Sequence, residues 1–590
     1  MCGIVGVIAQ EPVAPLLLES LKKMEYRGYD SVDIATIDGT RICLRKNIGK
    51  LDAVQNEHHL DKLPGVVGIG RTRWATRGGV TAANAHPHWD CSHEVAVVHN
   101  GILDNYQELR KGLELRHTFL SETDTEVIPH LIEDYMKERT SLEQSVLMVM
   151  ENIKGSYALL AISGLEPGKI VAARKDSPLV IGLDGNRSFI ASDSLSFIDK
   201  THQVIYADDG EVIVITNSKV SFLNAQGKEV IKSPVKISWE WGETTYQGYD
   251  HFMLKEIQEE PQSIRRAAIQ DRNLINETAI DILRARQVII TGSGTSRYAS
   301  IIGRYLFAKL SGTLCEVVMS SEFHYFADAV DKNTLIIAVS QSGETADTLR
   351  GAKMAKEKGA RVLSVVNVVG SSLARLSDRV IYLNCGPEVC VAATKTFVAQ
   401  LSIFYFLSYA MINQLQEGLG NLEEVSNILE SYINANGHRL AEIADKTKHH
   451  RDFYYIAKGI NPTIAGEGSL KLKEVLYLHA EGMPAGELKH GTLALIEQGT
   501  PVVVICPRDY TFEETLTSAI EVKARGGLVI GVSDEDDSTF DEWVPISKVE
   551  EIFYPLITIV PLQLFAYQLA VVLGKDPDKP CNLAKSVTVN

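Results

Sequence analysis

The stretch LIIAVSQSGETADTLRGAKMAKEKGARVLSVV (335–366) joins an apolar strand, a Ser- and Gly-rich loop, a helical pattern and a second apolar strand. This order of elements is typical of a parallel βαβ unit. It returns downstream, where PVVVI (501–505) leads through a helical pattern to LVIGV (528–532). A further strand precedes each copy and runs into a glycine loop, VIITG (288–292) in the first and FYYIA (453–457) in the second. We therefore predict two tandem α/β units with parallel sheets.

The first 216 residues have a different pattern, in which short strands are separated by Gly, Asn and Asp turns. Strands are predicted at 95–98, 170–173 and 211–215, and helical patterns occur near 13–24 and 123–137. Many strands with few helices predict an α+β arrangement of stacked β-sheets with helices outside.

Composition limits the classes of partner. The net charge of −16, without basic runs, excludes nucleic acid and an anionic membrane as expected partners. The eight cysteines are scattered without a CxxC pair, which is typical of a reducing cytoplasm, and no Cys/His spacing indicates a zinc site. No signal peptide is expected. The apolar stretches 397–412 and 552–573 contain polar residues, so we expect buried helices and no membrane span.

Cys2 follows the initiator methionine directly. Removal of Met1 would place a thiol and a free α-amino group on one residue. Such an amine titrates at about pH 7.7–8.0 and can serve as the general base for its own thiol. This is the logic of an N-terminal nucleophile hydrolase, whereas the alternative interpretation is a small apolar residue that starts a strand.

Several polar residues near predicted strand ends suit a glutamine-hydrolysing thiol site. Arg73 can bind a substrate carboxylate, Asp124 can bind its ammonium group, and the Asn100-Gly101 pair can donate to an oxyanion. Each residue alone has an ordinary alternative, because Arg73 could be a surface charge and Asn100-Gly101 a turn. Thr123 or Asp124 could be a helix cap, with Glu126 in the first turn.

Eight motifs occur in order behind Cys2. They are CGIVG (2–6), EYRGYDS (25–31), RWAT (73–76), NAHPH (84–88), HNGI (99–102), SETDTEV (121–127), SPLVIG (177–182) and IASD (190–193). This set resembles the glutaminase domain of class II amidotransferases. The resemblance implies that Cys2 attacks the glutamine amide and that Asn100 and Gly101 form the oxyanion hole. It also implies a glutamine site at Arg73, Trp74, Thr76 and Asp124, with Trp74 helping to close a route for ammonia.

Three positions depart from this family pattern. Arg77 stands where the family usually has His, and Arg71 stands where the family commonly has His or another residue. Asp33 takes a place where Gly is expected, and we expect Asp to be tolerated because it visits left-handed backbone more readily than most residues. None of the three removes the nucleophile or the oxyanion hole.

Two loops of the second half predict a phosphate site. GSGTS (292–296) and SQSGET (340–345) each join a strand to a helix, where hydroxyl groups and open amides attract an anion. The Lys of a nucleotide-binding P-loop is missing, which favours a sugar monophosphate over a nucleoside triphosphate. Either loop alone could be a plain turn with a helix cap.

Further charged residues suggest sugar chemistry. Lys471 and Glu474 share one face of a predicted, largely buried helix, where a carboxylate can move a proton between sugar carbons. His490 lies in GELKHG (486–491), and Lys585 lies in the tail, where its amine can form a Schiff base with a carbonyl. The alternatives are an exposed ion pair and a structural histidine.

The second half is similar to tandem sugar-isomerase (SIS) domains, and more closely to the synthase half of the glutamine–fructose-6-phosphate aminotransferases. The matching motifs are HFMLKEI (251–257), SQSGETADT (340–348), ATKTF (393–397), LKLKE (470–474), GELKHG (486–491) and NLAKSVTV (582–589). The resemblance implies an N-terminal nucleophile hydrolase-type sandwich followed by two flavodoxin-like SIS subdomains. Departures are Ser293 where Cys is common, Cys390 for Gly, and Ala393 where Ser is common.

This resemblance also implies residue roles. Glu474 moves the C1–C2 proton, His490 opens the sugar ring from a neighbouring subunit of a homodimer, and Lys585 forms the Schiff base. The sugar phosphate site is expected at Thr295, Ser296, Ser340, Gln341, Ser342, Thr345, Lys471 and Ala584. The predicted segments are a glutaminase domain (1–231), a linker (232–250), two SIS domains (251–430 and 431–575) and a tail (576–590).

The expected activity is transfer of ammonia from glutamine to fructose 6-phosphate, followed by isomerisation to glucosamine 6-phosphate, with no cofactor and no metal. One alternative is a related amidotransferase acting on another sugar phosphate, which Cys390 and Ala393 keep open. Another is a non-catalytic sugar-phosphate sensor. A phosphoribosyl amidotransferase would share the glutaminase half but needs a pyrophosphate loop.

Overall fold

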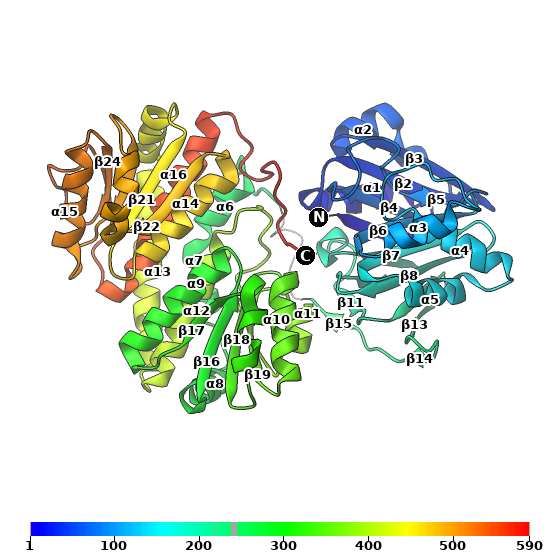
Figure 1. Ribbon diagram of the computed structural model, residues 1–590, viewed down its shortest axis with the longest axis horizontal. Coiled ribbons are helices and arrows are strands. Elements are labelled where there is room, and N and C mark those ends of the chain that lie inside the picture. Colours follow the sequence, from blue (N-terminus) through cyan, green and yellow to red (C-terminus); the bar gives the residue numbers. More distant parts are fainter. Residues whose placement is uncertain (1, 218, 238–242, 244, 589–590) are drawn as a thin grey trace. The chain divides into compact units, whose positions relative to one another are not determined.

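The computed structural model (Figure 1) describes residues 2–217, 219–237, 243 and 245–588. The chain forms two compact units. The first contains residues 1–241 with the short segments 344–346 and 584–590, and the second contains residues 242–343 and 347–583.

Two antiparallel sheets form the first unit. The eight-stranded sheet has the order β15 (Val235–Lys236), β11 (Gln203–Tyr206), β9 (Val180–Asp184), β10 (Arg187–Ala191), β1 (Gly3–Ile8), β4 (Val67–Arg73), β2 (Ser31–Asp38) and β3 (Arg41–Ile48). The seven-stranded sheet has the order β14 (Glu229–Val230), β13 (Val220–Leu223), β12 (Val212–Thr216), β8 (Lys169–Lys175), β7 (Gly155–Ser163), β6 (Val95–Leu103) and β5 (His88–Trp89).

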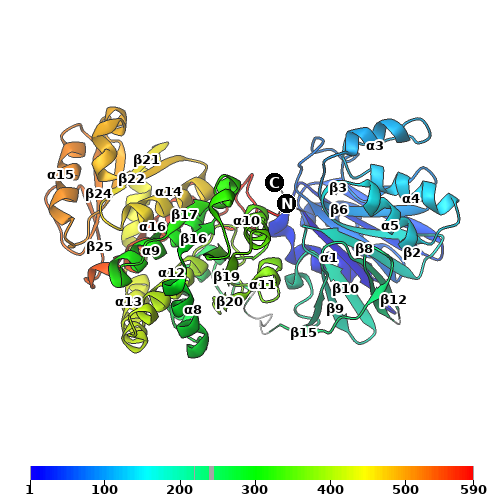
Figure 2. The same ribbon diagram turned by 60° about the horizontal axis from the view of Figure 1, so that its bottom comes forward.

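Strand β6 shows how the layers form, because successive side chains point to opposite faces of a strand. Val98 packs between the two sheets with Ile4 of β1, whereas Val97 packs outward against Ile128. The outer helices are α1 (Ala14–Lys23) on the first sheet and α4 (Val127–Lys137) and α5 (Leu142–Asn152) on the second, as Figure 2 shows. The predicted sandwich of stacked sheets with outer helices is confirmed.

Details of this unit differ from the sequence prediction. Beyond the two predicted helices, the unit contains α5 and two short helices, α2 (Leu51–His58) and α3 (Tyr106–Leu113). The stretch 232–250 is not entirely linker, since it contains β15, which pairs with β11. Residues 238–242 and 244 of that stretch lie outside the described residues.

The second unit contains two parallel five-stranded sheets. One has the order β17 (Glu316–Met319), β16 (Gln287–Gly292), β18 (Thr334–Ser340), β19 (Arg361–Val366) and β20 (Arg379–Tyr382). The other has the order β22 (His479–Pro484), β21 (Asp452–Ala457), β23 (Pro501–Ile505), β24 (Leu528–Ser533) and β25 (Glu542–Pro545). Both follow the flavodoxin-like order 2-1-3-4-5, so the predicted tandem repeat is confirmed.

Helices cover the sheets of the second unit (Figure 1). They are α6 (Phe252–Gln258), α7 (Glu260–Ala267), α8 (Arg272–Arg284), α9 (Thr295–Leu306), α10 (Ala346–Glu357), α11 (Ser372–Leu376), α12 (Lys395–Met411), α13 (Leu415–Thr447), α14 (Pro462–Leu476), α15 (Phe512–Lys523) and α16 (Tyr554–Val572). One apolar core joins both sheets through α12 and α16. The predicted boundary at 430/431 falls inside α13, so the two repeats share a continuous helix.

The two apolar stretches form α12 and α16, and both are buried, as predicted. Among the described residues, one helical segment, Glu551–Val572, is long and apolar enough to cross a membrane. Of its most apolar window, 83% is buried inside the protein, which is typical of a core helix.

Candidate active site

Cys2 immediately precedes β1 and is buried. Strand β4 lies beside β1 and brings Arg71 and Trp74 to the thiol. The Nη2 atom of Arg71 donates to the Cys2 Sγ atom at 2.6 Å, and the Trp74 amide donates to it at 3.2 Å. Among the described residues, the thiol thus accepts from the Arg71 guanidinium and from one backbone amide.

These neighbours favour the thiolate. Burial raises the pKa of Cys2, but the Arg71 charge and the hydrogen bond to Trp74 oppose it, and the net pKa is lowered. A lowered pKa is the usual device for activating a cysteine nucleophile. The Nε and Nη1 atoms of Arg71 are buried and have no hydrogen-bond partner among the described residues. Within this part of the chain, the Cys2 thiol is thus the hydrogen-bond acceptor of the guanidinium.

The expected oxyanion donors lie in the middle of β6. Asn100 is buried, and its Nδ2 atom has no hydrogen-bond partner among the described residues. Gly101 has φ of 145°, and a Cβ atom there would lie 2.0 Å from the carbonyl oxygen of Ser156. A buried amide donor without a partner is costly, so a ligand oxygen is a suitable partner for it. The strand runs on through Leu103 and does not end at Asn100.

The expected glutamine-binding residues Arg73, Trp74 and Thr76 differ in burial and in the groups that they contact. Arg73 is buried, and its guanidinium donates to the carbonyl oxygens of Arg77, Gly78 and Gly79. The side chain of Trp74 packs edge-on to Tyr29, with the ring centroids 5.9 Å apart. Thr76 is exposed.

Asp124 is not a helix cap. Its Oδ2 atom accepts from the amide of Leu103 at 2.8 Å, and α4 begins only at Val127. Glu126, which we expected in the first turn, is the residue before the helix, and it accepts from the amides of Leu120 and Ser121. Asp124 therefore joins this loop to the end of β6, and Glu126 holds the start of the loop, because a buried carboxylate must be hydrogen-bonded.

The second unit brings the two hydroxyl loops together. Strands β16 and β18 are adjacent and parallel, so the loops that follow them lie at the same edge of the sheet. Ser296, in the first turn of α9, accepts from Gln400 at 3.0 Å, and Ser340 accepts from the amide of Gly343 at 3.1 Å. Gln341 and Ser342 lie in the second loop, and residues 344–346, including Thr345, group with the first unit.

A buried charge cluster lies on α14. Lys471 contacts Glu474 at 2.6 Å, Glu467 at 3.2 Å and the hydroxyl of Thr295 at 3.1 Å. Burial lowers the pKa of Lys471, but the two glutamates outweigh it and the net pKa is raised. Burial raises the pKa of Glu467 to about 7, although the charge of Lys471 opposes this. The predicted burial of this helix is correct, and the pair is no exposed surface bridge.

The remaining expected sugar-site residues, His490, Ala584 and Lys585, do not belong to α14. His490 ends a short helical turn (Ala485–His490), and its side chain is exposed. Ala584 and Lys585 belong to the segment 584–590, which groups with the first unit.

Comparisons with known proteins agree with this architecture. A glutamine amidotransferase domain family matches residues 73–199, and the SIS domain family matches residues 281–410 and 447–573. Glutamine–fructose-6-phosphate aminotransferases (isomerizing) of Methanothermobacter thermautotrophicus and Thermococcus kodakarensis are 45% and 42% identical to this chain, over 100% of each chain. The chain belongs to the glutamine–fructose-6-phosphate aminotransferase family.

A solved structure supports the same assignment for the second unit. The C-terminal domain of a glucosamine-fructose-6-phosphate aminotransferase from Francisella tularensis covers 57% of this chain and 99% of its own length. The sequence identity is 29% and the TM-score is 0.53.

Among the departures from the aminotransferase family pattern, Asp33 is explained differently from our expectation. It lies inside β2, where the backbone is extended, and not in a left-handed turn. Its carboxylate is buried and accepts from the amide of His86 at 3.0 Å. Burial raises its pKa to about 7, although the charges of Lys46 and Arg71 oppose this. Asp33 therefore pairs across the sheet with another departure, Arg71.

Contacts are defined for two other departures, Arg77 and Cys390. The guanidinium of Arg77 lies 4.9 Å from the ring centre of Tyr106, so it stacks on an aromatic face. The amide of Cys390 donates to Glu256.

Sequence reasoning missed Arg71 as a partner of the thiol and Glu467 as a partner of Lys471. The spacing of Glu467, four residues before Lys471 on one helix, was a readable signal for the second.

Proposed function

We propose that this chain transfers the amide nitrogen of glutamine to fructose 6-phosphate and isomerises the product to glucosamine 6-phosphate, releasing glutamate. The observation that carries the proposal is the full-length identity of 45% to a glutamine–fructose-6-phosphate aminotransferase. The surroundings of Cys2 and Lys471 supply chemistry for the two half-reactions.

In the first half-reaction, the Cys2 thiolate attacks the amide carbon of glutamine. The negative charge on the tetrahedral oxygen is stabilised by Nδ2 of Asn100 and the amide of Gly101. Collapse of this intermediate expels the amide nitrogen, protonated by the α-amino group, as ammonia. Water then hydrolyses the thioester to give glutamate and the free thiol. The carboxylate of Asp124 and the guanidinium of Arg73 bind the α-amino and α-carboxylate groups of the substrate.

In the second half-reaction, the hydroxyl loops after β16 and β18 hold the phosphate. Lys585 condenses with the C2 carbonyl of the open-chain sugar and releases water. Ammonia adds at C2 and the lysine amine leaves. Glu474 then removes a proton from C1 and a proton is returned at C2, which converts the ketose skeleton into the aldose. The ammonium group of Lys471 lies 2.6 Å from the carboxylate of Glu474.

Ring opening by His490 requires a second subunit in this proposal. The exposed position of His490 suits a residue donated to the partner of a homodimer. A location in the cytoplasm accords with the scattered cysteines of the sequence.

The test is product analysis with the purified chain, after mass spectrometry establishes loss of Met1. Glutamine and fructose 6-phosphate should yield glutamate and glucosamine 6-phosphate, and Cys2→Ala should yield neither. Glutamate without an amino sugar would instead favour another sugar phosphate, a candidate that Ala393 supports because the family often has Ser there. Substantial glutamate release by Cys2→Ala would contradict the assigned nucleophile.

A further inference from the structure

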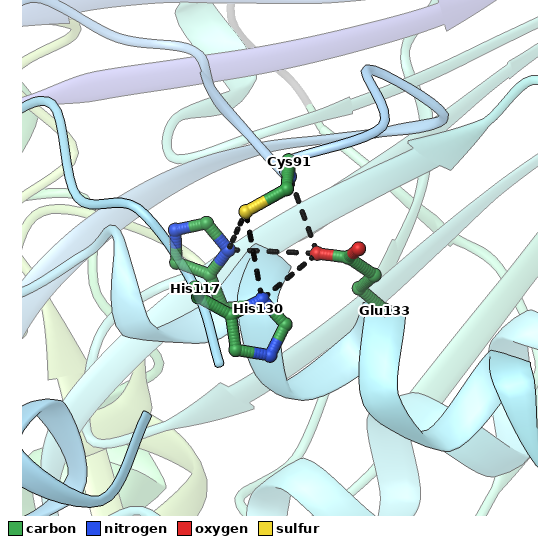
Figure 3. A group of neighbouring side chains, drawn as sticks. All are labelled: Cys91, His117, His130 and Glu133. Carbon is green, nitrogen blue, oxygen red and sulfur yellow. Dashed lines mark hydrogen bonds and ion pairs between the residues drawn. The ribbon is translucent and has the colours of Figure 1, made fainter. Parts of the chain in front are cut away.

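A second constellation of reactive side chains lies in the first unit, away from Cys2 in the sequence. Cys91, His117, His130 and Glu133 converge so that their ligand atoms all lie within 4.8 Å of one another (Figure 3). His117, His130 and Glu133 are buried. None of these residues takes part in the glutamine or sugar chemistry described above.

The distances fit a tetrahedral metal ion. Sγ of Cys91 lies 3.6 Å from Nδ1 of His117 and 3.8 Å from Nδ1 of His130. Oε2 of Glu133 lies 3.1 Å and 3.6 Å from the same two nitrogens. Four ligands around one zinc ion, at ordinary Zn–S, Zn–N and Zn–O lengths, lie about 3.3–3.6 Å apart.

The surroundings match those of bound metal ligands. Nε2 of His117 contacts Oδ1 of Asp134 at 2.9 Å, the carboxylate–histidine arrangement that orients imidazole ligands. The amide of Thr118 donates to Sγ of Cys91 at 3.4 Å. The ring of Phe119 lies edge-on to His130, with the ring centres 4.6 Å apart, and packs an apolar group against this imidazole.

We propose that Cys91, His117, His130 and Glu133 bind one zinc ion. Thiolate, imidazole and carboxylate together are ligands typical of zinc, and four protein ligands leave no open position for catalysis. The site is therefore structural. Spacing along the sequence could not reveal it, because Cys91 comes from the turn before β6, His117 from the loop after α3, and the other two from α4.

The position of the ion predicts a stabilising role. The ion would link the turn before β6 to helix α4. Strand β6 carries Asn100 and Gly101, and α4 follows Asp124. Loss of zinc should therefore lower the unfolding temperature of the first unit. The alternative for the same geometry is an ion-free network, in which His117 contacts Glu133 and Asp134 directly.

The test measures zinc in the full-length protein, purified without a metal-affinity tag and incubated with zinc sulfate before gel filtration in metal-free buffer. Elemental analysis should find about one zinc per chain in the wild type and in Cys43→Ser, a matched cysteine on β3. Cys91→Ser should retain less than a tenth of this amount. Asp134→Asn should bind zinc about 10- to 100-fold more weakly in competition with a chelator.

Cobalt provides a readout that needs no variant to fold. Co²⁺ added to the metal-free wild type should produce the visible absorption of a tetrahedral ion and a thiolate-to-cobalt charge-transfer band. Wild-type protein that retains no zinc after incubation, or a cobalt spectrum without the thiolate band, would overturn the proposal in favour of the ion-free network.

Discussion

At the scale of single residues, the most consequential contact is that between Arg71 and the Cys2 thiol, at 2.6 Å. Unlike histidine, arginine keeps its positive charge throughout the physiological pH range. Arg71 in turn neighbours the buried carboxylate of Asp33 across the sheet. Asp33 and Arg71 thus form a buried acid–base pair of neighbouring residues, in which the Arg71 charge also lowers the pKa of Cys2.

Replacing Arg71 by Met should therefore raise the pKa of Cys2. A hydrogen bond to a charged group contributes about 1.5–3 kcal/mol, so alkylation of Cys2 by iodoacetamide at pH 7 should slow by about tenfold or more. Arg71→Lys, which keeps a positive charge, should restore part of the rate. An alkylation profile against pH that is unchanged in Arg71→Met would contradict the role of this contact.

Glu467 predicts a pH effect in the second unit. Its pKa rises from the ordinary 4.5 to about 7 on folding, so the protonated carboxyl is favoured in the folded protein. Its contribution to the free energy of unfolding is full below about pH 4.5 and is lost as pH rises through about 7, by on the order of 3 kcal/mol.

Thermal unfolding of Glu467→Gln between pH 4.5 and pH 8 checks this slope. The amide does not titrate, so the variant should become more stable relative to the wild type as pH rises. Glu481→Gln, at an exposed position on β22, serves as the control and should run parallel to the wild type. If Glu467→Gln also runs parallel, the carboxyl does not titrate in this range.

At the scale of elements, β6 links the core to the chemistry. The strand packs on both faces, and it carries Asn100 and Gly101. Gly101 pairs with Tyr157 of β7 and leaves no room for a side chain. A shift of the β6 backbone at this point would therefore displace both the oxyanion donors and the core side chains of the strand.

Gly101→Ala tests this dependence. The added Cβ atom would meet the Ser156 carbonyl oxygen at 2.0 Å, at a φ of 145° that side chains rarely adopt. We expect a destabilisation on the order of 3 kcal/mol or more, together with loss of glutaminase activity. Gly112→Ala, where the glycine faces open space on α3, should be tolerated. Unchanged unfolding and activity in Gly101→Ala would contradict the close packing of this strand.

The elements also show what could be predicted from sequence. Long apolar strands and the helices α12 and α16 were predictable, because their patterns are continuous. The short helices α2 and α3 offer too few turns for a clear period. Helix α5 was readable, since Ser141 and Gln144 form a capping box at its start, but this signal was overlooked. The contacts of Asp33 and the convergence of Cys91 with His117 depend on tertiary structure, so no local pattern reveals them.

At the scale of the whole molecule, the glutamine and sugar half-reactions use different side chains, which predicts separable defects. Lys585→Ala should end sugar turnover while glutaminase activity continues in part, because the proposed Schiff base needs the Lys585 amine whereas the attack on glutamine needs the Cys2 thiol. Assays of glutamate and glucosamine 6-phosphate on the same variant measure both. Unimpaired amino-sugar formation by Lys585→Ala would refute the Schiff base.

The central claim, that one chain passes glutamine nitrogen to the sugar, is tested most directly by isotope tracing. The full-length protein is incubated with fructose 6-phosphate and glutamine labelled with ¹⁵N at the amide, in the presence of excess unlabelled ammonium. The account predicts glucosamine 6-phosphate that carries the label, in equal amount to the glutamate formed. Labelled ammonia with unlabelled or absent amino sugar would contradict the account.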